Sequence, residues 1–188
     1  MHGDASNTTV RLDITPIPDA DIDALVSAWA AKEAAGKGMG VASPRDSIAT
    51  MIGGTRVSID YGRPAKRGRA IWGKLVPFDT VWRLGANAPT LLSIDKSLRI
   101  GGTTLLAGTY SLWLVPSDRA PYLLVNRQTQ GWVGVPMHDA TQDLARIPVC
   151  KHAGLPAGEE RFRILVQDGL LMMLWDTGGY EVPIGATP

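Results

Sequence analysis

Residues 161–184 of the chain have the sequence RFRILVQDGLLMMLWDTGGYEVPI. Short runs of Val, Ile, Leu and aromatic residues are separated here by turn residues, which is typical of β-strands. Asp168-Gly169 separates the first two runs, and Gly accepts the positive φ that a two-residue type I′ turn requires. The segment predicts an antiparallel hairpin followed by a third strand, over Arg161–Gln167, Leu170–Trp175 and Tyr180–Ile184.

Similar runs recur upstream at intervals of roughly 8 to 12 residues, the spacing expected of a sandwich or barrel. No long helical segment alternates with them, which disfavours parallel crossover connections. Residues 43–188 are therefore predicted to form an all-β domain, an antiparallel β-sandwich of jelly-roll or Greek-key type. Its further expected strands are Thr55–Tyr61, Pro89–Ile94, Ser97–Ile100, Thr109–Val115, Tyr122–Asn126 and Leu144–Cys150.

Residues 1–42 do not show this pattern of short apolar runs and are predicted to form an N-terminal extension. Apolar residues at helical spacing, supported by alanines, predict one amphipathic helix over about Asp19–Ala35, before a Gly-rich link. The helix could dock on another chain, as in a structural subunit of a larger assembly, or pack within its own. The apolar residues that would make this contact are Ile22, Leu25, Val26 and Trp29.

Composition narrows the classes of function. The 188 residues are 45% apolar and 20% charged with a net charge of +1, which argues against a dominant nucleic-acid or membrane-surface role. No apolar run is long enough to span a membrane, and the N-terminal residues as given lack the pattern of a signal peptide. The single Cys150 excludes an intramolecular disulfide and is expected to be a small buried hydrophobe in its strand.

The densest local signal is the segment 60–90, DYGRPAKRGRAIWGKLVPFDTVWRLGANAPT. Between Arg63 and Arg83 it carries six bases and one acid, a local charge of +5, interleaved with glycines and with Trp72 and Trp82. Guanidinium groups recognise carboxylate or phosphate, and Trp faces stack on rings, so we expect a site for a small anionic or carbohydrate ligand. The candidate ligand-binding residues are Tyr61, Arg63, Arg69, Trp72, Trp82, Arg83, Asn87, His138 and Asp176.

The same residues have a structural interpretation. Arg63 and Arg83 would pair with backbone carbonyls or with acids such as Asp176, while Trp72 and Trp82 would fill the core. Glu159-Glu160 is the other acidic group that is expected to form ion pairs with the arginines. Under this interpretation the arginines fix the loop and bind nothing.

Evidence for catalysis is sparser. His138-Asp139 could act as a general base or bind a metal, but no zinc motif and no nucleophile elbow accompany it. We therefore expect no catalytic residues, metal or cofactor, and favour a non-catalytic binding or interaction module. The alternative is a hydrolase or isomerase of small metabolites that uses Asp60, Asp139 or Asp176 beside an arginine.

Ordered blocks of this segment and of the later strands resemble the domain-of-unknown-function family 2911 over about residues 43–184. The resemblance implies an all-β domain common in exported bacterial proteins, hence a periplasmic or secreted location, and implies no established activity. Where such sequences have Tyr-Asp soon after Trp-Gly, this chain has Trp132-Val133-Gly134 and then His138-Asp139. The matching blocks include Tyr61-Gly62-Arg63-Pro64, Arg67-Gly68-Arg69, Gly73-Lys74-Leu75-Val76-Pro77, Val81-Trp82-Arg83, Gly85-Ala86-Asn87 and Ala107–Leu112.

Overall fold

The structure is a computed structural model that describes residues 21–34, 43–130, 138–152 and 154–187. Residues 42–188 form one compact unit, and the N-terminal helix α1 (Ile22–Ala34) belongs to a separate one. The Asp21 side chain accepts a hydrogen bond from the backbone N–H of Ala24, an N-cap that fixes the start of α1. The amphipathic character and the docking role that the sequence suggests for α1 stay predictions.

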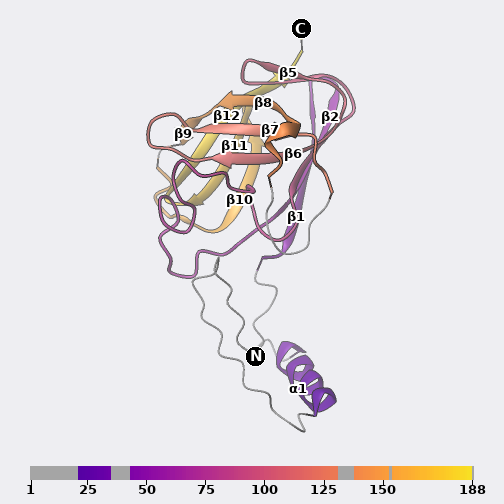
Figure 1. Cartoon of the computed structure of the whole chain (residues 1–188), viewed down its shortest axis with the longest axis vertical. Helices are drawn as coiled ribbons and strands as arrows, with labels where there is room; N and C mark the ends of the chain where they lie inside the picture. The colour runs from indigo at the N-terminus through magenta and orange to yellow at the C-terminus, as the bar shows by residue number, and fades with distance from the viewer. Residues whose placement is uncertain (1–20, 35–42, 131–137, 153, 188) are drawn as a thin grey trace. The chain divides into compact units, whose positions relative to one another are not determined.

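The compact unit contains two antiparallel sheets (Figure 1). The first has the strand order β1-β2-β3-β6-β7-β8, and the second has the order β10-β11-β12-β4-β5, with β9 also paired to β12. The strands of the first sheet are β1 (Arg45–Ile52), β2 (Thr55–Gly62), β3 (Thr90–Ile94), β6 (Gly108–Val115), β7 (Tyr122–Asn126) and β8 (Asp143–Pro148). Those of the second are β4 (Leu98–Ile100), β5 (Thr103–Leu105), β9 (Cys150–His152), β10 (Glu159–Gln167), β11 (Leu170–Asp176) and β12 (Gly178–Ala186).

The predicted hairpin is confirmed. Gln167 pairs with Leu170, and Asp168 and Gly169 have φ values of 53° and 74°, the two positive values of a type I′ turn. Later in the chain, β12 returns to pair with the much earlier β4, which is a Greek-key type of connection. The sequence therefore predicted the fold class correctly.

Both sheets contribute to one hydrophobic core, which makes the unit a sandwich. Inward-facing residues alternate with more exposed ones along β2 and β10, as the two-residue period of a strand requires. A smaller cluster around Trp113 packs separately. The main cluster joins Ile59 of β2 and Leu112 of β6 to Ile164 of β10, Met173 of β11 and Val182 of β12.

Three details correct the sequence predictions. β1 was not predicted, because this edge strand alternates half-buried and exposed residues without an apolar run. The strand expected over Leu144–Cys150 is two strands, since the chain leaves the first sheet after Pro148 and pairs with β12 of the second from Cys150 onward. Cys150 is exposed, because Ile147 and Val149 occupy the inward positions of the alternation.

Candidate functional site

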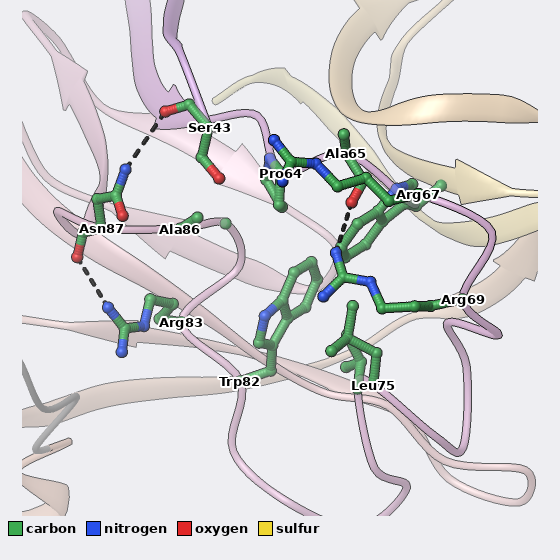
Figure 2. Close-up of a pocket in the computed structure, with 13 residues that line it drawn as sticks. Ser43, Pro64, Ala65, Arg67, Arg69, Leu75, Trp82, Arg83, Ala86 and Asn87 are labelled. Carbon is green, nitrogen blue, oxygen red and sulfur yellow. Dashed lines mark hydrogen bonds between the residues drawn. The ribbon is translucent and has the colours of Figure 1, made fainter. Parts of the chain in front are cut away.

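A pocket of about 520 Å³ lies where the chain leaves β2 and crosses to the edge of β10. Two segments of the Arg/Trp-rich stretch face each other across it, residues 64–69 and residues 82–87 (Figure 2). Arg67 and Arg69 extend from the first segment, Arg83 and Asn87 belong to the second, and Trp82 lies between them. The lining is completed by Ser43, Pro64, Ala65, Leu75, Val76, Gly85, Ala86 and Trp175.

The first segment is fixed to the second sheet by backbone pairing. The N–H of Phe162 donates to Pro64 O at 2.9 Å, and the N–H of Lys66 donates to Glu160 O at 2.7 Å. These bonds cover the outer edge of β10 and leave the following residues to turn away from it. Arg67 makes that turn with a φ of 50°, a left-handed conformation that is costly for an arginine.

The two arginines of this segment are held differently. Arg69 donates from Nε to Lys66 O at 2.9 Å and from Nη2 to Ala65 O at 2.7 Å, which fixes its guanidinium without neutralising its charge. The Arg67 backbone N–H donates to a Glu160 carboxylate oxygen at 2.9 Å. Within the described residues the Arg67 guanidinium has no hydrogen-bond acceptor.

The second segment is fixed to β6 and to the interior. Trp82 and Leu114 exchange both backbone hydrogen bonds, at 2.8 and 2.9 Å. Leu84 is fully buried with a φ of 51°, and its carbonyl accepts a 2.6 Å bond from the Thr90 hydroxyl. The loop then brings Asn87 O within 2.8 Å of Arg83 Nη1 (Figure 2). Burial lowers the pKa of Arg83, which nevertheless stays a cation because arginine titrates far above neutral pH.

The inner wall of the pocket is aromatic. The rings of Trp82 and Trp175 stack with their centroids 5.9 Å apart and their planes 18° apart. Trp82 also meets Phe162 edge-on at 5.0 Å, so its indole position is set by core packing. One tryptophan therefore serves the hydrophobic core and the pocket at once.

The charged side chains that line the pocket are all positive. Three arginines line it, and its described lining contains no Asp or Glu. Neighbouring carboxylates have other partners: Asp46 pairs with Arg63 at 3.1 Å, Asp60 pairs with Arg45, and Glu160 accepts from the backbone N–H of Arg67. The arrangement therefore concentrates positive charge beside an apolar wall, which suits a negatively charged group.

Four of the candidate ligand-binding residues line this pocket: Arg69, Trp82, Arg83 and Asn87. Tyr61 is buried in the core, where burial raises its pKa, and Trp72 packs edge-on against Trp82 and Tyr180. The sequence reasoning missed Arg67, Leu75 and Trp175. Arg67 belongs to the Arg-Gly-Arg block and could have been found there, whereas Trp175 has the signature of an ordinary core strand.

Asp176 has a different partner from the expected ones. Lys66 Nζ lies 2.5 Å from its carboxylate, so Asp176 pairs with a lysine and not with Arg63 or Arg83, the two arginines considered in the sequence analysis. Arg63 instead donates from Nε to Phe162 O at 3.2 Å in addition to its pair with Asp46. The structural interpretation therefore holds for Arg63, through Asp46 and a carbonyl, and for Arg83, whose guanidinium donates to Asn87 O. Trp72 and Trp82 pack against the hydrophobic core, as that interpretation also expected.

His138 lies outside the pocket, in a separate cluster. Its Nε2 is 2.7 Å from Asp143, and its ring centroid is 5.1 Å from that of Trp113. The adjacent Asp139 caps the short 3₁₀ helix η1 (Ala140–Gln142) instead. Hydrogen bonds from Gln142 and Thr141 lower the pKa of Asp139. Trp132, Val133 and Gly134 lie outside the described residues.

Two negative findings concern the described part of the chain alone. No three of its His, Cys, Asp or Glu side chains gather as metal ligands would. Its helical segments also lack the combination of length and apolar character needed to cross a membrane.

The fold and the site define an antiparallel β-sandwich domain with an arginine-lined pocket beside its edge strand β10. The chain belongs to the DUF2911 family, described as proteins of unknown function, whose profile matches residues 43–184. This match confirms the resemblance found in the sequence blocks. No curated protein and no solved structure matches the chain.

Proposed function

We propose that this sandwich is a non-catalytic ligand-binding domain that holds a small anion in the pocket between residues 64–69 and 82–87. The observation that carries the proposal is the presence of three arginines in a described lining with no carboxylate. The volume of about 520 Å³ lies within the range of small-molecule sites, roughly 300 to 1,000 Å³.

Backbone strain supports a binding role for this place. Arg67, Leu84 and Asn87 have φ values of 50°, 51° and 64°, and all three belong to the two segments that form the pocket. Each such residue costs on the order of 1 kcal/mol or more, and strained residues cluster at ligand sites. The strain holds the two arginine-bearing segments in one fixed geometry.

Binding is favoured over catalysis because the described lining offers no general acid or base. It contains no His, Asp, Glu, Lys, Cys or Tyr, and arginine does not give up its proton near neutral pH. Asp60, Asp139 and Asp176, the acids of the alternative enzymatic hypothesis, are absent from this lining.

Thermal denaturation in the presence of candidate ligands tests the proposal. Phosphate, succinate and glucose 6-phosphate should each be compared with glucose and with sodium chloride at the same ionic strength. A ligand present at ten times its Kd stabilises the folded state by about 1.4 kcal/mol, a shift of a few degrees in Tm. If no anion raises Tm above the chloride control, the proposal is wrong.

A matched pair of variants locates the effect. Arg67→Gln removes a cation from the lining of the pocket. Folding should be preserved, because the bond from Arg67 to Glu160 comes from its backbone N–H, which the variant keeps. Arg99→Gln removes the same charge from an exposed position of β4 outside the pocket. We expect the first to weaken anion binding about tenfold or more and the second to change it little, because bonds to charged groups contribute roughly 1.5 to 3 kcal/mol.

A further inference from the structure

The pocket has an apolar side that a bare inorganic ion would leave unused. Seven of its thirteen lining residues are apolar, against three arginines. Val76 and Trp175 are buried, whereas Leu75 is 41% exposed. The apolar members of the lining are Pro64, Ala65, Leu75, Val76, Trp82, Ala86 and Trp175.

The exposed leucine is held in place by its backbone. The N–H of Leu75 donates to Ala70 O at 3.2 Å, and that of Val76 donates to Ile71 O at 2.9 Å. The N–H of Gly73 donates back to Val76 O at 2.9 Å and closes the turn. Leu75 therefore presents a fixed apolar surface at the mouth of the pocket.

That surface adjoins the charged one. Figure 2 shows the Leu75 side chain beside the Trp82 indole and next to the Arg69 guanidinium, with Arg67 on the same side of the pocket. Arg69 is fixed by two carbonyls, and Trp82 is fixed by its stacking on Trp175. A ligand whose charged group meets Arg67 and Arg69 would thus place its adjoining atoms against Leu75 and Trp82.

We infer that the pocket selects amphipathic organic anions, in which a carboxylate or phosphate group is joined directly to an apolar ring or chain. This inference rests on the proposed function. Arg67 and Arg69 bind the charged group, and Leu75 and Trp82 contact the apolar body. Burying roughly 100 Å² of apolar surface, counted over ligand and pocket together, at about 25 cal/mol per Å² corresponds to roughly a seventyfold gain in affinity.

Calorimetric titration with matched ligand pairs tests this. Phenyl phosphate is compared with methyl phosphate, and benzoate with acetate, so that the charged group stays constant within each pair. In at least one pair the aromatic member should bind ten times more tightly or better. Equal affinities within both pairs would overturn the inference and leave the proposed function standing, whereas no binding by any of the four would overturn both.

Variants separate the two sides of the pocket. Leu75→Gln should weaken the aromatic ligand about three- to fivefold and leave the methyl or acetyl ligand unchanged. Leu106→Gln is the matched control, because Leu106 is 70% exposed and does not line the pocket. Arg67→Gln should weaken both members of a pair alike. If Leu75→Gln and Leu106→Gln have equal effects on the aromatic ligand, the apolar body does not contact Leu75 and the inference is wrong.

Discussion

Gly62, the last residue of β2, lies directly against the backbone carbonyl of Ala86 in the pocket. A Cβ at residue 62 would overlap that carbonyl oxygen. The contact is reciprocal, because a Cβ on Gly85 would come within 2.9 Å of Gly62 O. The pocket segment therefore rests on the end of β2 with no side chain between the two backbones.

Gly62→Ala is expected to displace the 84–87 loop, since neither backbone can yield easily. We expect the free energy of unfolding to fall by about 1 to 3 kcal/mol, as for other overpacked sites, and anion affinity to fall with it. Urea unfolding and calorimetric titration measure the two effects. Gly102→Ala serves as control, because no atom lies within 4 Å of its Cβ position. Equal stability of the two variants would show that this contact does not constrain the loop.

The pair between Lys66 and Asp176 gives a second prediction. The two side chains are 31% and 18% exposed, so the carboxylate is largely withdrawn from water. Lys66→Met should lower the free energy of unfolding by roughly 1 to 3 kcal/mol, because it leaves a partly buried carboxylate without its cation. Lys96→Met, at an exposed turn position, is the control for loss of one lysine charge. A Lys66→Met variant as stable as this control would contradict the pairing.

The Asp168-Gly169 turn gives a third prediction. Gly169 has a φ of 74°, where an L-residue with a Cβ is disfavoured by roughly 1 to 2 kcal/mol. Gly169→Ala should reduce stability by about that amount without changing the Kd for anions, because the turn does not line the pocket. Asp168→Gly should be nearly neutral. Chemical denaturation of the two variants settles the comparison, and an Ala variant with unchanged stability would argue against the type I′ turn.

Tyr180 makes stability depend on alkaline pH. Burial raises its pKa to about 12, against an opposing hydrogen bond from the backbone of Ser117. The unfolded tyrosine titrates near 10, so between pH 10 and 12 the unfolded chain loses a proton that the folded chain keeps. The stability that the raised pKa of Tyr180 contributes is fully present below pH 10. It is lost as pH rises toward 12, by roughly 2 kcal/mol in all.

Tyr180→Phe keeps the aromatic ring that meets Trp72 edge-on and removes the ionisable group. The variant should therefore lose less stability than the wild type between pH 10 and 11.5, as measured by urea unfolding at several pH values. Burial also raises the pKa of Tyr61, so some alkaline destabilisation will persist in the variant. Identical pH dependence of the two proteins would show that Tyr180 ionises freely in the folded state.

Local signals explain which parts of the fold could be predicted. The Asp168-Gly169 hairpin and the strand period are properties of neighbouring residues, and they were sufficient for the sandwich. Strand β1 could not be predicted, because an edge strand needs no apolar run. The burial of Cys150 was predicted wrongly, because the point where the chain changes sheets decides which residues face inward.

Residues of the candidate site could be predicted only where they lie in one dense block of sequence. Arg69, Trp82, Arg83 and Asn87 come from that block and meet in the pocket. The partner of Asp176 depends on which segment covers the edge of β10, a relationship across 110 residues that no local pattern records. Trp175 likewise becomes a pocket residue only because residues 64–69 and 82–87 converge over it.

The central claim, that the pocket binds an anion in solution, is tested most directly by nuclear magnetic resonance of the tryptophan indole and arginine Nε–H groups during a phenyl phosphate titration. We predict saturable shifts of the Trp82 and Arg69 signals, both from pocket residues, with the indole signal of Trp113, which belongs to the separate smaller cluster, unchanged. Uniform small shifts of all indole signals, or no shift of Trp82 and Arg69 at saturating ligand, would contradict it.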